Sequence, residues 1–256
     1  MLRKKLADKL FGLKEGFEWR GTEITRFESL SDAVFGFAVT LLIVSLEVPR
    51  TFTQLRETMR GFFAFAICFV LLLLIWYQQY IFFRRYGLQD IRTIVLNSAL
   101  LFMVLFYIYP LKFLFTLLVN AWMGRSLDVT LPGGIVQPAI LPEQMQTLML
   151  VYGGGYVLVF FIFALMFFHA CQLREALRLT RLEIFETRVS LVDCAINICV
   201  GVISIGVAVI GGVKNAGFAG LVYPVLTIPA FTTFGIIAGR RRETLNQQLS
   251  NETAAQ

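Results

Sequence analysis

Six long apolar runs, separated by shorter segments that hold most of the charged residues, divide the chain. The runs cover residues 32–48, 61–83, 93–119, 147–172, 188–211 and 215–239. A helix needs roughly 20 apolar residues to cross about 30 Å of hydrocarbon, and the runs are close to this length or longer. They are continuous rather than alternating in polarity, which favours helices over barrel strands. The pattern predicts an all-α membrane protein with six transmembrane helices, in one domain spanning residues 1–256.

The composition agrees with a polytopic membrane protein. Hydrophobic residues make up 57% of the chain and charged residues 16%, and the mean hydropathy is +0.71. A soluble core of this size has no room for that much apolar surface. The net charge of +6 comes from basic residues beside the ends of the runs, where membrane topology and anionic lipids explain them. We expect membrane lipids as partners and no nucleic acid.

The basic residues also predict an orientation. Most of the 23 lysines and arginines lie before the first run, between the second and third, between the fourth and fifth, and after the sixth. The positive-inside rule then predicts a multi-pass protein of the cell membrane with both termini cytoplasmic. The loop over residues 120–146 is rich in proline and glycine and is expected to cover the outer surface. Residues 243–256 are polar without an apolar period, which predicts a disordered tail.

Polar residues lie at the threshold of the first run. In residues 26–32, RFESLSD, a basic residue, a hydroxyl and a carboxylate meet hydrocarbon, where each needs a partner or water. One interpretation is that Ser31 and Asp32 cap the helix while Arg26 reaches lipid phosphates. The other is that Arg26, Ser31 and Asp32 form a network that fixes this helix to its neighbours.

Three further residues are candidates for the same network. They are polar or amphipathic groups inside apolar stretches, where partners on other helices are expected. These residues are Trp76, Gln79 and Asn97. Interfacial anchoring by the tryptophan and isolated hydrogen bonds between helices are the simpler alternatives, and the sequence leaves both open.

A family signature covers the threshold. Arg26, Leu30-Ser31-Asp32, Ala38 and Thr40-Leu41 resemble the pattern R-x-x-x-F-S-D-x-x-x-x-x-A-x-T-L of the transmembrane protein 175 family, the lysosomal and bacterial potassium channels. The order of later pieces extends the resemblance: WYQQ at residues 76–79, an asparagine at 97, and YPLKF at residues 109–113.

The chain departs from the family pattern at three positions. Leu30 replaces the usual phenylalanine, and Gln78 and Gln79 stand where histidines are usual. Glutamine hydrogen-bonds but does not titrate near neutral pH. Any proton sensitivity that belongs to those histidines is therefore expected to be absent or altered in this chain.

The resemblance implies a homotetramer in which the first helix of each subunit lines a potassium-permeable pore of the leak type. It places apolar constriction rings at Phe37, Leu41 and Val44, with Thr40 as a hydroxyl ring. The spacing agrees, because steps of four and three keep these residues on one helical face. Without the resemblance, ordinary apolar packing explains that face equally. At the outer mouth, Glu47 is expected either to pair with Arg50 or Arg56 or to attract cations as a ring of carboxylates.

Other functional classes receive less support. A secondary transporter with a site near Pro224 and Pro229, which are expected to break the sixth span, is the main alternative. The predicted spans contain no paired carboxylates, metal-ligand cluster or Ser/His constellation, so we expect no enzyme and no cofactor, only permeant potassium ions. His169, a lone histidine in an apolar stretch, is expected to be a hydrogen-bonded packing residue.

Overall fold

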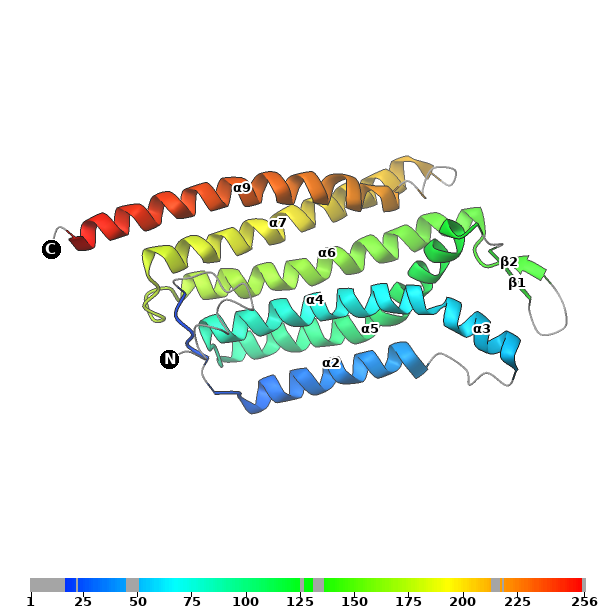
Figure 1. The fold of residues 1–256 in the computed structure, drawn as a ribbon, viewed down its shortest axis with the longest axis horizontal. Coiled ribbons are helices and arrows are strands. Elements are labelled where there is room, and N and C mark those ends of the chain that lie inside the picture. The colour runs from blue at the N-terminus through cyan, green and yellow to red at the C-terminus, as the bar shows by residue number, and fades with distance from the viewer. Residues whose placement is uncertain are drawn as a thin grey trace.

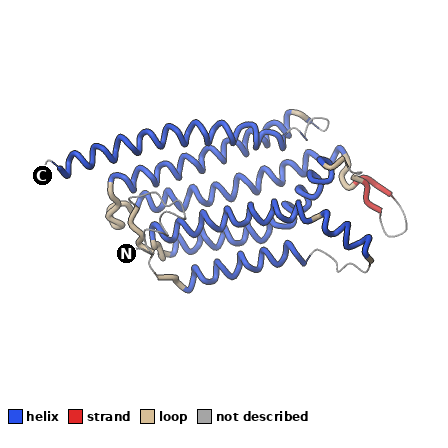
Figure 2. The backbone as a smooth tube through the Cα atoms, in the orientation of Figure 1, coloured by secondary structure: helices blue, strands red, loops and turns tan. Residues whose placement is uncertain are grey.

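The computed structural model describes residues 17–21, 23–44, 51–124, 127–130, 136–212, 217 and 219–254. Helices make up nearly all of this part of the chain, and Figure 2 shows strand only in one small hairpin. The helices labelled in Figure 1 are α2 (Arg26–Val44), α3 (Phe52–Arg60), α4 (Phe62–Tyr86), α5 (Ile91–Trp122), α6 (Pro142–Gln172), α7 (Arg181–Ile210) and α9 (Ala219–Ala254).

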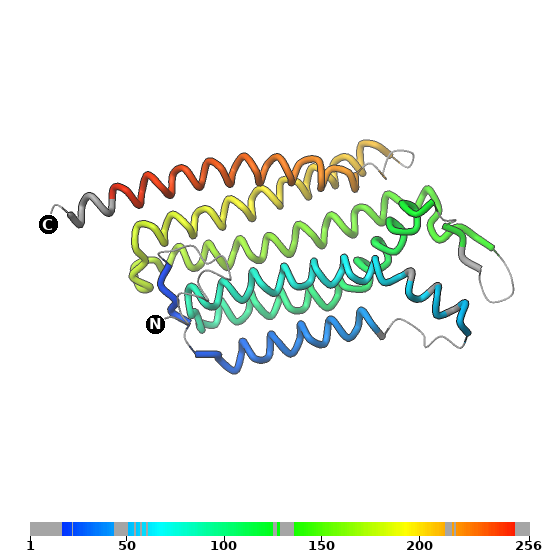
Figure 3. The backbone as a smooth tube through the Cα atoms, in the orientation of Figure 1, coloured from blue at the N-terminus to red at the C-terminus, as the bar shows by residue number. Residues whose placement is uncertain are grey.

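The long helices lie side by side in a bundle with two distinct edges. Helix α2 packs against α4 and α5, α5 packs against α6, α6 against α7, and α7 against α9. Figure 1 accordingly shows α2 and α9 at opposite edges. The start of α2 and the end of α9 lie at the same end of the bundle (Figure 3). That this end faces the cytoplasm stays a prediction.

Five helices of the described chain are long and apolar enough to cross a membrane: α4, α5, α6, α7 and α9 up to Gln248. Helix α2, the predicted first span, is not among them. It has 19 residues, and its first two turns carry Arg26, Glu28 and Asp32. Residues 45–48, the predicted end of that span, lie outside the described residues. A sixth crossing by α2 therefore stays a prediction.

Three expectations about connections and ends differ from the structure. Residues 243–254 continue α9 as a helix instead of a disordered tail, because Glu, Leu and Gln are good helix formers and an existing helix needs no new nucleus. The loop between α5 and α6 contains an antiparallel hairpin of β1 (Asp128–Thr130) and β2 (Val136–Pro138), so the described chain is mostly but not purely helical. Helix α9 is also continuous through Pro224 and Pro229, which removes the break on which the transporter alternative depended.

Aromatic and aliphatic side chains fill the end of the bundle where α2 begins. Phe82 and Tyr86 from α4 meet Phe163 and Phe167 from α6, all nearly inaccessible to solvent. Farther along, Gly155 of α6 allows α5 to approach, because a Cβ at this position would lie 2.2 Å from Cε2 of Tyr107. Gly155 thus serves close helix packing, as small residues do in membranes.

Candidate functional site

Helix α2 has one buried face and one exposed face. Phe35, Ala38 and Leu42 are 4%, 0% and 1% exposed and pack into a cluster with residues of α4 and α5. Phe37 is 56% exposed and Ile43 48% exposed. Both exposed side chains are large and apolar, so this face of α2 needs lipid or another protein surface to cover it.

The predicted pore residues occupy different positions around α2. Phe37 and Thr40 are exposed, and the Thr40 hydroxyl donates to the Phe37 carbonyl at 2.7 Å. Leu41 is half-buried and packs against the α2–α4–α5 cluster, at the flank of the exposed face. Val44 is the last residue of α2, and only its backbone is described. Glu47 lies outside the described residues. The roles assigned to these residues stay predictions.

A buried chain of amide and hydroxyl groups joins α2 to α4 and α5. The Asn97 amide donates to the Ser31 hydroxyl at 2.9 Å, and the Gln79 amide donates to the Asn97 carbonyl oxygen. The Ser31 hydroxyl donates to the Phe27 carbonyl at 3.0 Å. All three side chains are at most 2% exposed. Because unpaired polar groups are costly in an apolar interior, this chain specifies how the three helices meet.

A second bond joins α2 to α4 closer to the surface. The Trp76 indole N–H donates to Asp32 Oδ1 at 2.8 Å, and the Trp76 ring stacks on Tyr80 at a centroid distance of 5.7 Å. Asp32 is exposed. The structure therefore brings five of the six residues of the predicted network into contact, as one trio and one pair.

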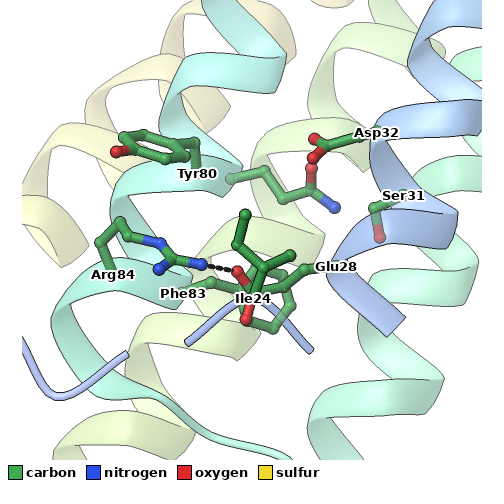
Figure 4. A pocket seen from close by; sticks show the side chains of 8 residues that line it. Ile24, Glu28, Ser31, Asp32, Tyr80, Phe83 and Arg84 are labelled. Carbon is green, nitrogen blue, oxygen red and sulfur yellow. Dashed lines mark hydrogen bonds and ion pairs between the residues drawn. The ribbon is translucent and has the colours of Figure 1, made fainter. Parts of the chain in front are cut away.

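Arg26 differs from its expected place in this network. Its side chain is exposed, and it makes no hydrogen bond or ion pair to the residues that the structure describes. The buried arginine is instead Arg84 of α4, which forms an ion pair with Glu28 and donates to the Gly21 carbonyl at 2.5 Å. Figure 4 shows Arg84 reaching Glu28 beside Ser31 and Asp32, in a polar pocket of about 120 Å³ between α2 and α4.

The capping residue of α2 also differs from the expected one. Ser31 and Asp32 lie inside the helix, which begins at Arg26. The Glu28 N–H donates to the Thr25 hydroxyl at 3.1 Å, and the Thr25 N–H lies 3.5 Å from Glu28 Oε1. This reciprocal pairing is a capping box. The sequence Thr-x-x-Glu at residues 25–28 is a typical sign of a helix start. The apolar run begins only at Ala33, so hydropathy alone placed the start of the helix too late.

At the far end of α2, a lysine of α5 contacts the helix backbone. Lys112 of α5 donates to the Leu42 carbonyl at 2.5 Å. Leu42 belongs to the last turn of α2, whose carbonyls lack partners within the helix. A cation is favourable at this negative end of the helix dipole. Helix α2 is thus bound to the rest of the bundle at both ends, with apolar packing between.

His169 lies away from α2 and bonds to Asp90, the N-cap of α5. Its Nε2 lies 2.8 Å from Asp90 Oδ2. Burial raises the pKa of Asp90, but hydrogen bonds from Thr93 and His169 outweigh it and leave that pKa below its usual value. The histidine therefore holds a helix cap, in agreement with the packing role expected for it.

The fold and the bonds around α2 define a polytopic helical membrane protein. Residues 26–107 match the family described as endosomal/lysosomal potassium channel TMEM175. A potassium channel of Marivirga tractuosa is 36% identical over 253 residues, which cover 95% of this chain and 99% of that relative. The chain therefore belongs to the TMEM175 family of potassium channels, which confirms the family predicted from the sequence and excludes an enzyme.

Two solved structures resemble this one. A variant of the potassium channel MtTMEM175, crystallised with a nanobody–MBP fusion protein, has a TM-score of 0.77 and 36% identity, covering 89% of this chain and 99% of that chain. A lysosomal potassium-selective channel TMEM175 homologue from Chamaesiphon minutus has a TM-score of 0.53 and 20% identity, covering 83% and 96%. The second likeness concerns the fold alone.

Proposed function

We propose that this chain forms a homotetrameric, potassium-permeable leak channel in the cell membrane, with both termini cytoplasmic and α2 lining the central pore. Family membership supports potassium conduction. One observation carries the choice of α2 as the pore helix. Its Ser31 side is bonded to α4 and α5, whereas Phe37 on another side is 56% exposed at the edge of the bundle.

The exposed face of α2 has the composition of a hydrophobic constriction. In the proposed assembly, Phe37, Leu41 and Val44 form successive apolar rings around the axis, and Thr40 supplies a ring of hydroxyls. A hydrated cation gains no oxygen ligands from an apolar ring, so such a ring holds ions back by dewetting. The half-buried Leu41 contributes at the flank, so Phe37 is expected to dominate the narrowest level.

Ion flux into liposomes tests this assignment. Phe37→Asn places amide groups at the proposed constriction, so water and cations enter more readily, and potassium flux is expected to rise severalfold. Ile237→Asn is the matched control, because Ile237 is 55% exposed and lies on α9, at the opposite edge of the bundle. Its flux should equal that of the parent protein.

Three outcomes are informative. A rise in Phe37→Asn alone supports α2 as the pore helix. Equal flux in Phe37→Asn and the parent excludes Phe37 from the constriction. An equal rise in both variants means that asparagine in any exposed helix face makes the membrane leak, and the assignment is then wrong. A potassium gradient read by a pH- or voltage-coupled dye measures the flux, and light scattering of the purified protein measures the expected tetrameric mass.

A further inference from the structure

A short segment crosses the end of the bundle immediately before α2. Residues 17–21, which we name the strap, run between the start of α7 and the end of α4. Phe17 of the strap meets Tyr86 of α4 edge-on, at a centroid distance of 5.7 Å. The strap therefore lies between α7 and α4, in the chain that leads to α2.

A bidentate ion pair fixes the strap to α7. Arg20 Nη1 and Nη2 donate to the two carboxylate oxygens of Glu183 at 2.8 and 2.9 Å. Glu183 is 0% exposed and also accepts from the backbone N–H groups of Glu18 at 2.9 Å and Thr180 at 2.8 Å. Arg20 Nε donates to the Leu177 carbonyl at 2.9 Å. A planar, fully bonded pair of this kind has little geometric freedom.

The other end of the strap lies against the backbone of α4. The Gly21 N–H donates to the Arg84 carbonyl at 3.2 Å, and the Arg84 guanidinium donates back to the Gly21 carbonyl. A Cβ on Gly21 would lie 2.4 Å from the Phe83 oxygen, so only glycine allows this approach. Arg84 then pairs with Glu28 of α2. A continuous polar path therefore runs from α7 through the strap and α4 to the start of α2.

We infer that the strap holds the inner end of α2 back against its own subunit and so keeps the pore hydrated, with Arg20 and Glu183 as positioning residues for conduction. This inference rests on the proposed function. Apolar faces that surround a water-filled axis attract one another. The ion pair between Arg20 and Glu183 opposes the inward movement of α2 that this attraction favours, because it ties the chain before α2 to α7.

Neutral variants of the ion pair test the inference. Glu183→Gln offers one acceptor oxygen where four N–H groups need two, so the hold of α7 on the strap weakens. Arg20→Gln removes the two guanidinium N–H donors of the same ion pair. Potassium flux per tetramer is expected to fall severalfold in both. Arg20→Lys keeps the positive charge but not the bidentate geometry of the guanidinium. Its flux should therefore lie between those of the parent and Arg20→Gln. Arg188→Gln, an exposed arginine of the same helix α7, is the control and should match the parent.

A double variant separates positioning from simple stability. If the loosened strap acts by letting the Phe37 ring dewet, then Phe37→Asn combined with Glu183→Gln should conduct like Phe37→Asn alone. A loss of flux in the same proportion as in Glu183→Gln alone would show a stability effect and overturn the inference. Parental flux in Glu183→Gln and Arg20→Gln would overturn it as well. Should Glu183→Gln fail to assemble, Arg20→Lys carries the same comparison.

The same set of variants distinguishes failure of the strap from failure of the pore assignment. If Phe37→Asn raises flux while Glu183→Gln conducts like the parent, the strap alone is excluded. If Phe37→Asn leaves flux unchanged, the constriction is wrong whatever Glu183→Gln does, and the strap inference falls with it.

Discussion

The two edges of the bundle are held in different ways. In helix α2, the side chains of Glu28, Ser31 and Asp32 bond to residues of other helices. Helix α9 shows no buried residue in the described window of its span, and the hydroxyls of Thr232 and Thr233 bond to carbonyls of α9 itself. Lipid is as apolar as the side chains, so apolar contact alone positions a helix weakly. The polar bonds of α2 therefore specify how it meets its neighbours, whereas the apolar stretch of α9 is positioned by weaker apolar contacts.

The polar bonds that position each helix lie only in particular parts of that helix. Helix α9 does have polar contacts with α7, at its start, where the Ser204 hydroxyl donates to the Ala219 carbonyl at 2.9 Å, and beyond the apolar stretch, where Arg242 lies 3.2 Å from Glu186. Between these two contacts, the described side-chain hydrogen bonds of α9 stay within α9, and apolar contact alone joins this part to α7. Variants of the two edges should therefore differ in the size of their effect on stability, and three experiments test how far.

Removing the buried arginine should have the largest effect. Arg84→Ala leaves the carboxylate of Glu28, which is 8% exposed, buried without its partner. Loss of one member of a buried ion pair costs about 3–5 kcal/mol of unfolding free energy. Arg241→Ala, an exposed arginine on α9, is the control and should change little. Unfolding in mixed micelles measures both, and equal losses would contradict the contrast between the edges.

Removing the buried amide should have an intermediate effect. Asn97→Leu keeps the volume but leaves the Gln79 amide without its acceptor and Ser31 without its donor. Hydrogen bonds between membrane helices contribute roughly 0.6 to 1.7 kcal/mol, so a loss of about 1–2 kcal/mol is expected. Thr233→Val on α9 removes only a bond within one helix and serves as the matched comparison. If Thr233→Val costs as much, the position of a polar bond between helices has no special value.

The exposed pair should have the smallest effect on stability. A double-mutant cycle with Trp76→Phe and Asp32→Ala isolates the bond between these side chains. We expect a coupling of about 0.5 kcal/mol, because Asp32 is accessible to solvent. Asp32→Ala is nevertheless expected to lower the yield of tetramer or its flux, which light scattering and the liposome assay measure. Full assembly and full flux in Asp32→Ala would remove this bond from the proposed mechanism.

Hydropathy predicted most of the helices, and local rules predicted part of the site. Polar residues inside apolar runs need partners on other helices, and Asn97 and Gln79 do bond across α4 and α5 in the structure. Arg84 was assigned only to membrane topology, although a buried carboxylate at Glu28 required a nearby cation. The rule for basic residues at membrane faces is statistical and does not distinguish an arginine in water from one folded back between helices.

The remaining contacts depend on tertiary structure. Arg20 and Glu183 are separated by 163 positions, and no spacing rule brings them together. The sequence did contain half of that site, because Thr180 and Glu183 form a capping box at the start of α7. The pattern contained no indication that residues 17–21 run between α7 and α4.

The ion pair of Arg84 with Glu28 and the bond of Asn97 to Ser31 hold two positions of α2 that are three residues apart. A helix turns by about 100° with each residue. One residue inserted between Glu28 and Ser31 would therefore rotate the rest of α2 relative to the Glu28 contact and present another stripe of side chains at the bundle edge. The spacing of these two bonded residues thus sets which side chains of the rest of the helix face outward.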